Sequence, residues 1–415
     1  MNRLNVGRLC VVGLGYIGLP TATVFADNGV DVLGVDIDAR AVESINKGRP
    51  HIVEPELDVL LRKVVHAGNL RASLKPEPAD AFIIAVPTPF KDGHEPDLSF
   101  IQAAARAIAP VLTAGNLVIL ESTSPVGATE ELSRWLSGHR SDLTFPHQTG
   151  ELSDIRIAHC PERVLPGQIL REVVENDRII GGVTRKCAQA AMTLYRVFVK
   201  GKIHLTNART AEMAKLSENA YRDVNIAFAN ELSMICDKQR INVWELIKLA
   251  NLHPRVNILQ PGPGVGGHCI AVDPWFIVAA DPANSRLIRQ AREVNNSKPH
   301  FVVEKVKKHA AALRRPVIAC LGLSYKANVH DLRESPAIEI VEMLAKAQVG
   351  ELLIVEPHVN ALPIDLLELG LELSDFDQAV ERANILLLLV DHLSFLNIDH
   401  DVVKDKIVVD TRGVW

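Results

Sequence analysis

Residues 9–18 read LCVVGLGYIG, an apolar run that leads into three glycines at positions 13, 15 and 18. The apolar run predicts a buried strand, and the residues after the third glycine are compatible with a helix. A strand, a glycine turn and a helix in this order are typical of the phosphate-binding corner of a dinucleotide-binding βαβ unit. We expect Gly13 to permit the tight turn, Gly15 to let the backbone approach a pyrophosphate, and Gly18 to allow close packing of the helix.

A carboxylate follows at the distance that such a corner requires. Asp36 ends the run DVLGVD at residues 31–36, where it would accept hydrogen bonds from ribose hydroxyls and repel a 2′-phosphate. The sequence therefore favours NAD over NADP as cofactor. The alternative is a glycine turn that binds no ligand.

Outward from this corner the chain divides into three parts. Strand-like apolar runs at 9–12, 32–35, 81–86 and 117–120 alternate with helical stretches, which predicts a parallel sheet with helices on both faces. Residues 211–239 contain no Gly or Pro and predict one long helix. Strand-like runs return at 317–321, 352–355, 385–390 and 407–409. We predict an α/β chain in which two Rossmann-like doubly wound domains, at 1–205 and 301–415, flank a helical middle domain at 206–300.

Composition excludes several classes of protein. The 415 residues are 47% hydrophobic and 23% charged, with a net charge of -5, as in ordinary globular proteins. No dense Lys/Arg block suggests nucleic-acid binding, and even the apolar run 383–390 is too short to span a membrane. The six cysteines are scattered without a CxxC pair, which favours a reducing compartment and argues against a metal site. We expect a cytoplasmic protein.

A second glycine-rich segment, PGPGVGGHCIAVD at 261–273, leads directly into a cysteine. Glycines let a backbone wrap closely around a ligand. If a helix starts near Cys269, its unpaired N–H groups would lower the thiol pKa and supply a nucleophile, with Asp273 one turn further on. The alternative is a small buried hydrophobic residue, which is our expectation for Cys10, Cys187, Cys236 and Cys320.

The predicted long helix carries Lys215, Asn219 and Arg222 at spacings of four and three, so all three lie on one face. Such a stripe suits an anionic or oxyanionic substrate, and Lys215 could transfer a proton or stabilise negative charge. The alternative is a solvated helix face.

Polar residues in several loops are further candidates. Thr88, Thr123 and Thr129 follow predicted strands, where open α/β sheets bind ligands, although threonine is also a common turn residue. His253 and Arg255 are candidate phosphate or sugar contacts, or simply surface residues. The dipeptides at 159–160 and 268–269 are both His-Cys, but without paired ligand spacing we do not expect zinc.

The motifs GLGYIGLP, VPTP, ESTSPVG, CPERVLPG, AEMAKLSENAYRDVNIAFANE, GPGVGGHC, LGLSYKANVHDLRESP and VDTRGVW occur in this order along the chain. Together they resemble those of the UDP-glucose/GDP-mannose dehydrogenase family, whose members are NAD-dependent four-electron oxidases of sugar nucleotides. The resemblance covers nearly the whole chain. It implies that Cys269 is the nucleophile, that Lys215 donates or accepts protons, and that Asn219 orients groups around the reacting carbon.

The resemblance also assigns further residues. It implies proton transfer or water activation by Glu162 and Asp273. Thr123 is also expected among the catalytic residues. Contacts to the UDP-sugar are implied for Arg163, Val164, Lys215, Asn219, Arg222, His253, Arg255, Gly266, Tyr325, Lys326 and Arg412. Contacts to NAD are implied for Gly13, Gly15, Tyr16, Ile17, Gly18, Asp36, Thr88, Thr129 and Arg333. Family members are typically homodimers through the middle domain, where His253 and Arg255 would reach the neighbouring subunit's site.

The substrate implied by the resemblance is UDP-N-acetyl-D-mannosamine, oxidised at C6 to the uronate for surface polysaccharide synthesis of the bacterial type. Enzymes of the UDP-glucose branch usually have serine before the nucleophile and a lysine where this chain has Val272, whereas His268 stands here. UDP-N-acetylglucosamine is the alternative sugar. A β-hydroxyacid dehydrogenase, which shares the Lys-x-x-x-Asn pair but needs no Cys269, and an NAD-binding regulator are alternative functions.

Overall fold

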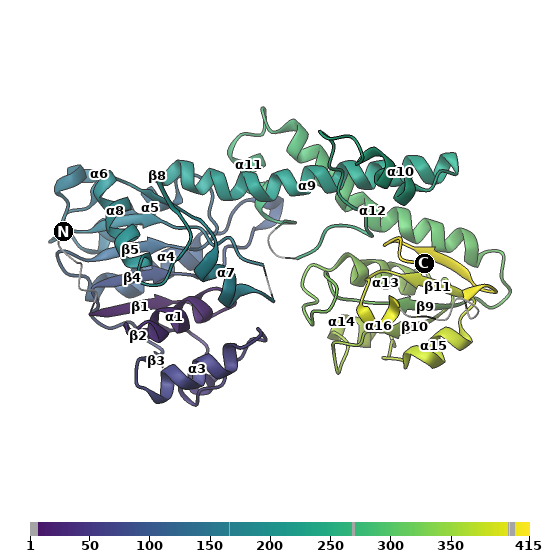
Figure 1. Cartoon of the computed structure of the whole chain (residues 1–415), viewed down its shortest axis with the longest axis horizontal. Coiled ribbons are helices and arrows are strands. Elements are labelled where there is room, and N and C mark those ends of the chain that lie inside the picture. The colour runs from purple at the N-terminus through teal and green to yellow at the C-terminus, as the bar shows by residue number, and fades with distance from the viewer. Residues whose placement is uncertain (1–6, 166, 268–269, 397, 399–402) are drawn as a thin grey trace. The chain divides into compact units, whose positions relative to one another are not determined.

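The computed structural model describes residues 7–165, 167–267, 270–396, 398 and 403–415. It forms two compact units, Met1–Glu218 and Asn219–Trp415, and the boundary between them lies inside the long helix α9 (Ala208–Gln239). Each unit contains a β-sheet flanked by helices (Figure 1). The predicted fold class, an α/β chain with a sheet at each end and a helical region between them, is confirmed.

The first unit is built on a sheet whose strands follow the order β3-β2-β1-β4-β5-β6-β7-β8. The strands are β1 (Arg8–Val12), β2 (Asp31–Val35), β3 (Leu70–Ser73), β4 (Ala81–Ile84), β5 (Leu117–Leu120), β6 (Arg156–His159), β7 (Arg178–Gly182) and β8 (Ile203–Asn207). All neighbours are parallel except β6 and β7, which are antiparallel. The predicted parallel sheet is confirmed except at this one pair. There β7 starts beyond the carboxyl end of β6 and runs back along it, so the connection needs no crossover.

Helices cover both faces of this sheet. They are α1 (Gly18–Asp27), α2 (Ala39–Asn46), α3 (Leu57–His66), α4 (Ser99–Ile108), α5 (Ala128–His139), α6 (Pro146–Thr149), α7 (Ile169–Glu175) and α8 (Arg185–Tyr195), with short 3₁₀ turns at Asp92–His94, Ala109–Val111 and Gly150–Leu152. Leu9 and Val11 of β1 pack with Phe25 of α1, whereas Cys10 and Val12 pack in a second cluster with α4 and α5. This alternation, set by the two-residue period of the strand, produces the two layers.

The second unit begins with helices and ends with a smaller sheet. After α9 come α10 (Val243–Ala250), α11 (Asp273–Ala280) and α12 (Arg286–Ala310), followed by β9 (Val317–Leu321), α13 (Pro336–Lys346), β10 (Glu351–Val355), α14 (Ile364–Glu368), α15 (Phe376–Arg382), β11 (Ile385–Leu388), α16 (Leu393–Leu396) and β12 (Ile407–Asp410). The sheet is parallel, with the order β10-β9-β11-β12. Ile318 packs with Val306 of α12, so a helix of the middle region covers one face of this sheet. No helix in the described parts of the chain combines the length and apolar character that crossing a membrane requires.

Candidate active site

The glycine corner of the first unit has the predicted geometry. Gly13 has φ 93°, and a Cβ there would lie 2.6 Å from the carbonyl oxygen of Ala85. A Cβ on Gly18 would lie 1.8 Å from the carbonyl oxygen of Gly13, so the start of α1 packs directly against the turn. Gly15 differs, because the space around its missing Cβ is open among the described residues. That open space fits the close approach of a pyrophosphate to the backbone.

Asp36 lies directly after β2 and is half-buried. Its Oδ2 accepts the N–H of Leu14 at 2.9 Å, and its Oδ1 accepts the N–H of Asp38 at 2.9 Å. Each carboxylate oxygen retains a further lone pair for a ribose hydroxyl. Tyr16 and Ile17, also expected to contact NAD, are half-buried in the turn before α1.

Two of the predicted threonine contacts are engaged with the protein itself. Thr88 donates to the carbonyl oxygen of Thr123 at 2.6 Å, which ties the loop after β4 to the loop after β5. Thr129 is fully buried and donates to Glu212 of α9 at 2.6 Å. Glu212 also accepts the N–H groups of Gly127 and Thr129, at 2.6 and 2.8 Å, and so caps the start of α5. Burial raises the pKa of Glu212, although these hydrogen bonds oppose the shift.

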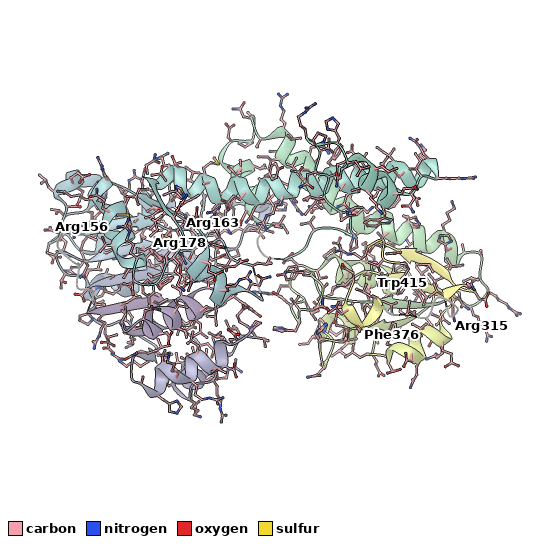
Figure 2. All side chains as sticks on the ribbon, viewed as in Figure 1. Arg156, Arg163, Arg178, Arg315, Phe376 and Trp415 are labelled. Atoms are coloured by element: carbon pink, nitrogen blue, oxygen red, sulfur yellow. The ribbon has the colours of Figure 1, made fainter. Side chains whose placement is uncertain are left out.

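Lys215 and Glu162 form the first cluster of predicted catalytic residues. The Lys215 Nζ lies 3.9 Å from Glu162 Oε2, and Lys215 is 5% exposed. Glu162 also accepts the N–H of Val164. The neighbouring Arg163, labelled in Figure 2, pairs with Glu218 of α9 at 2.7 Å. The structure thus brings the CPER loop against the helix that carries Lys215.

Buried charged residues contact the first residue of the CPER loop, Cys160. Arg178, labelled in Figure 2, stands at the start of β7, 3.6 Å from Cys160 Sγ and 3.6 Å from Glu121 Oε1. Its guanidinium lies over the ring of Tyr195, 4.6 Å from the ring centroid. Burial raises the pKa of Cys160, so this thiol is poorly suited to be a nucleophile. Further along the same connection, Glu54 accepts the N–H groups of Gly167 and Ile169, at 2.9 and 2.7 Å.

Asn219 and Asp273 form the second cluster, in the second unit. Asn219 is fully buried and its Nδ2 donates to Asp273 Oδ2, while Arg222 donates to Asn219 Oδ1. Asp273 is the first residue of α11, and Pro274 follows it. His268 and Cys269 lie outside the described residues. A thiol pKa lowered by a helix would require a helix that starts near Cys269. In the described residues α11 begins at Asp273, where Pro274 fixes the φ of the first turn.

The glycine segment before Cys269 is anchored by a buried polar ladder. The N–H of Gly262 donates to Asn230 Oδ1 at 2.9 Å, and Asn230 donates to Asn295 at 2.9 Å. Asn295 in turn donates to Asp223, which pairs with the buried Arg292 at 2.5 Å. The ladder joins α9 to α12 and fixes where the glycine segment begins.

Tyr325 lies beside the end of this glycine segment. A Cβ on Gly266 would lie 2.9 Å from Tyr325 Cβ, and one on Gly267 would lie 3.0 Å from the Tyr325 ring. Lys326 follows on the same loop, and its carbonyl oxygen accepts the hydroxyl of Ser324 at 2.7 Å. The structure therefore brings together three of the expected substrate contacts: Gly266, Tyr325 and Lys326.

Arg412 also lies against the glycine segment, because a Cβ on Gly262 would lie 2.8 Å from its Nη1. Arg412 pairs with Asp391 at 2.8 Å, and Arg333 pairs with Asp331 at 2.6 Å. His253 and Arg255 lie on an exposed loop after α10, where the N–H of Arg255 donates to His253 Nδ1 at 3.3 Å.

Three models of one family match consecutive parts of the chain. They are the NAD binding domain at residues 7–199, the central domain at 209–297 and the UDP binding domain at 319–415. The chain belongs to the UDP-glucose/GDP-mannose dehydrogenase family. It is therefore an NAD-dependent dehydrogenase of sugar nucleotides, and the predicted cofactor is confirmed.

Relatives cover almost the whole chain. A Ralstonia nicotianae protein named NDP-N-acetyl-D-galactosaminuronic acid dehydrogenase is 66% identical over 412 residues, 99% of this chain and 97% of that protein. The UDP-N-acetyl-D-mannosamine dehydrogenase of Campylobacter jejuni is 60% identical over 405 residues, 97% of this chain and 99% of that protein. The solved structure of the UDP-D-ManNAc dehydrogenase of Pyrococcus horikoshii matches with a TM-score of 0.89 at 41% identity, over 98% of this chain and 96% of that one.

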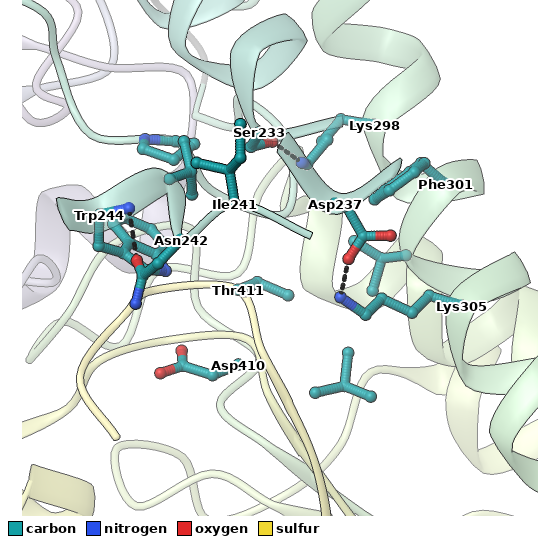
Figure 3. Close-up of a pocket in the computed structure, with 14 residues that line it drawn as sticks. Ser233, Asp237, Ile241, Asn242, Trp244, Lys298, Phe301, Lys305, Asp410 and Thr411 are labelled. Carbon is teal, nitrogen blue, oxygen red and sulfur yellow. Dashed lines mark hydrogen bonds and ion pairs between the residues drawn. The ribbon is translucent and has the colours of Figure 1, made fainter. Parts of the chain in front are cut away.

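A cavity of about 260 Å³ in the second unit is lined by residues of α9, α10, α12 and the end of β12 (Figure 3). Ser233, Trp244, Lys298 and Thr411 are among the residues that line it. Lys298 donates to Ser233, and burial lowers its pKa to about 8. Trp244 packs against Gly413, so the cavity wall also supports the turn that carries Arg412.

Sequence reasoning missed the residues that position the site. Glu54, Glu121, Glu212 and Arg292 were not predicted, although each is a buried charged residue. One signal was available for Glu212, which lies three residues before Lys215 on the same helix. The other partners are far apart in the sequence and gave no local signal.

Proposed function

We propose that this enzyme oxidises the C6 hydroxyl of UDP-N-acetyl-D-mannosamine to a carboxylate through covalent intermediates on Cys269. The overall reaction consumes one alcohol, two NAD and one water, and yields one carboxylate, two NADH and three protons. Bound NAD accepts a hydride in each oxidation step. The buried pair of Asn219 with Asp273, four residues after Cys269, is the observation that carries this proposal.

The chain's own residues supply the remaining chemistry. A base removes the hydroxyl proton as the alcohol becomes an aldehyde, and the Cys269 sulfur then adds to the aldehyde carbon to give a thiohemiacetal. A second oxidation gives the thioester, and water attack on the thioester releases the acid and restores the thiol. Lys215 beside Glu162 suits proton transfer and stabilisation of the oxyanion. Asp273, oriented by Asn219, suits the activation of water.

Two lines of support bear on the sugar. His268 and Val272 stand where the UDP-glucose branch usually has serine and lysine. The name of the Campylobacter jejuni relative supports the mannosamine substrate. The name of the Ralstonia nicotianae relative supports a second candidate, the galacto-configured N-acetylated sugar nucleotide. Both candidates use the same reaction at C6.

The first experiment measures NADH formed per sugar nucleotide consumed. UDP-N-acetylmannosamine, UDP-N-acetylgalactosamine, UDP-N-acetylglucosamine and UDP-glucose are compared in parallel. A ratio of two on the mannosamine substrate alone supports the whole proposal, and two on another sugar changes only the substrate. A ratio of one contradicts the thioester step and favours the hydroxyacid-type reaction. NAD binding without turnover on any sugar favours a regulator.

The nucleophile is tested by Cys269→Ser. We expect loss of net acid production, because an alkoxide is a poorer leaving group and serine is a weaker nucleophile. Cys236→Ala is the matched control, since it removes a buried thiol from α9. Unchanged acid formation by Cys269→Ser, measured by separating the nucleotide products, would overturn the covalent mechanism.

We propose further that the enzyme is a cytoplasmic homodimer with domains at 1–205, 206–300 and 301–415, and that it supplies a precursor for surface polysaccharide.

A candidate dimer interface lies on α9. Its residues Tyr221, Phe228 and Ile235 recur every seven residues and are 70%, 53% and 44% exposed, which suits packing of this helix against a second copy. Sedimentation of Phe228→Asp tests this: a monomer is expected, and an unchanged dimer would place the interface elsewhere.

A further inference from the structure

The cavity in the second unit, lined by residues of α9, α10, α12 and the end of β12, has no part in the proposed reaction (Figure 3). Its volume is about 260 Å³. An apolar cavity of about 150 Å³ already holds one benzene molecule, and pockets for drug-sized ligands begin at about 300 Å³. The cavity is therefore large enough for a single ring with a small polar group and too small for a whole nucleotide sugar.

Much of the cavity wall is apolar and partly aromatic. Apolar side chains from several elements line it, among them Ile241, Trp244, Phe301, Val302 and Val409. The Trp244 ring packs closely against the C-terminal turn, since a Cβ on Gly413 would lie 2.1 Å from it. Walls of aromatic and aliphatic side chains favour a ligand with a flat apolar body.

Lys298 of α12 brings a positive charge into this wall. The residue is 5% exposed, and its Nζ lies 4.9 Å from the centroid of the Phe301 ring. One of its three N–H groups donates to the hydroxyl of Ser233, which itself donates to the carbonyl oxygen of Asn230 at 2.6 Å. Among the described residues no carboxylate lies within 4.0 Å of this Nζ. A buried cation in this position is stabilised by a bound anion.

The other charged side chains in the described part of the wall already have partners. Lys305 forms an ion pair with Asp237 (Figure 3). Asp410 uses both carboxylate oxygens to accept the N–H groups of residues 412, 413, 414 and 415, at 2.7 to 2.9 Å. Burial, followed by the charge of Lys305, lowers the pKa of Lys298 to about 8, so its amine is still largely protonated at neutral pH. The cavity therefore offers one positive charge with two further N–H donors, which matches a ligand with one negative charge.

We propose that this cavity is a second binding site, for a small organic monoanion that carries a carboxylate on a flat apolar body. The carboxylate accepts the remaining N–H donors of Lys298, and the apolar body packs against Trp244 and Phe301. A dianion such as inorganic phosphate brings a second negative charge that no described side chain of the wall compensates. The residues that line the cavity are different from those assigned to NAD and to the sugar nucleotide, so the inference does not rest on the proposed function.

The test titrates the full chain with two probes at about pH 7, where a carboxylate is ionised and Lys298 is largely protonated. The probes are 4-fluorobenzoate and 4-fluorobenzamide, which have nearly the same size and shape but differ in charge, and fluorine NMR measures their affinities. We expect the wild type to bind the benzoate at least about tenfold more tightly than the benzamide. Equal affinities, or no binding of either probe, would overturn the proposal. So would displacement of the benzoate by inorganic phosphate at an equal concentration.

The role of the buried charge is tested by Lys298→Met, which keeps the length of the side chain and removes the ammonium. Affinity for 4-fluorobenzoate should fall about tenfold, to that of the benzamide, whose own affinity should not change. Lys307→Met is the matched control, because it makes the same change in net charge at a partly exposed position of α12 that pairs with Glu304. A preference for the benzoate that persists in Lys298→Met, or that is lost equally in Lys307→Met, contradicts the proposal.

A second measurement locates the bound probe in the wild type and does not depend on the folding of Lys298→Met. The chain has four tryptophans, so labelling them with nitrogen-15 gives few indole N–H signals, and Trp244→Phe identifies the signal of Trp244. Saturating 4-fluorobenzoate should shift this signal most, because Trp244 lines the cavity. Trp135, Trp275 and Trp415 serve as internal controls. A larger shift at any of these three, or none at Trp244, would place the probe outside the cavity and refute the inference.

Discussion

The two sheets begin with the same structural device and use it differently. Gly13 after β1 and Gly322 after β9 have φ values of 93° and 92°. Gly13 donates to the carbonyl oxygen of Val35 at 2.8 Å, and Gly322 donates to that of Val355 at 2.8 Å. The next N–H donates to a carboxylate one strand away in both units: Leu14 to Asp36, and Leu323 to Glu356.

The two turns lead into different structures. In the first unit α1 begins at Gly18, and Asp36 remains half-buried. In the second unit α13 begins only at Pro336, and the intervening loop covers Glu356, which is 4% exposed and bonded to three backbone N–H groups and His392. In both units the glycine turn after one strand is therefore bonded to a carboxylate that follows the neighbouring strand. The turn becomes a cofactor site only where the helix starts at once and the acid stays accessible.

The largest effects are expected from adding a methyl group to either turn. Gly13→Ala would place Cβ 2.6 Å from the Ala85 carbonyl oxygen, and Gly322→Ala would place it 2.4 Å from Val390 Cβ, both at positive φ. We expect each to lower the free energy of unfolding by about 2–4 kcal/mol. Only Gly13→Ala should abolish NAD binding, and only Gly322→Ala should abolish UDP binding.

Chemical denaturation and calorimetry measure these effects. Gly29→Ala and Gly370→Ala are the matched controls, because both have positive φ but open space among the described residues. They should cost only the backbone strain, about 1 kcal/mol. Loss of both ligands in either turn variant would mean that the two units do not fold independently.

Exchanging the two acids for amides separates their roles. Asp36→Asn should weaken NAD binding about 10- to 100-fold and reduce the preference of the enzyme for NAD over NADP, with little change in the free energy of unfolding. Glu356→Gln should leave NAD affinity unchanged and destabilise the fold by about 1–3 kcal/mol, since it loses acceptor capacity for buried N–H groups. Asp38→Asn, at the exposed start of α2, controls for charge. Equal NAD affinities of Asp36→Asn and the wild type would contradict the assignment.

A fully buried histidine gives the first sheet its own acid sensitivity. Burial lowers the pKa of His159 to about 3, so the unfolded chain binds a proton that the folded chain does not. Above the pKa of His159 in the unfolded chain, about 6.5, the ring is neutral in both states and the free energy of unfolding does not depend on its titration. As the pH falls from about 6.5 towards 3, only the unfolded chain takes up the proton, and the free energy of unfolding decreases. At about pH 5.5 the loss is about 1.4 kcal/mol.

His159→Leu should flatten this dependence. Urea denaturation at several pH values, with hydrogen exchange in β6, measures the slope. A slope identical to that of the wild type would show that other groups cause the acid sensitivity.

The smallest effects are expected at the amino-terminal ends of the strands in both sheets, opposite the ends that carry the predicted binding sites. Arg8 pairs with Asp31 at 2.8 Å and Arg382 pairs with Glu351 at 2.5 Å, all partly exposed near the starts of strands. Arg8→Ala and Arg382→Ala should each change stability by about 0.5 kcal/mol or less. Unchanged NAD and UDP affinities in both would show that binding is confined to the carboxyl edges, whereas a change in either would extend the sites.

Local patterns predicted the first sheet and the long helix well. The strand at 9–12, the turn at Gly13 and the helix around Lys215 depend on residues close in sequence, whose periodicity and glycine content are visible directly. The antiparallel β7 was not predicted, because strand direction is set by the path of the 160–177 connection. The sequence left the start of α11 open, and the structure places it at Asp273, directly before Pro274.

The sequence by itself determined the family, the NAD corner and the order of strands and helices, because these follow from local conformational preference and from ordered motifs. Only the tertiary structure decided which polar groups remain available. Thr129 is bonded to Glu212, 83 residues away, and Glu356 is bonded to His392, 36 residues away. A buried hydrogen bond forms only where the fold brings its donor and acceptor together. The residues next to either partner in the sequence do not specify which distant residue that partner will meet.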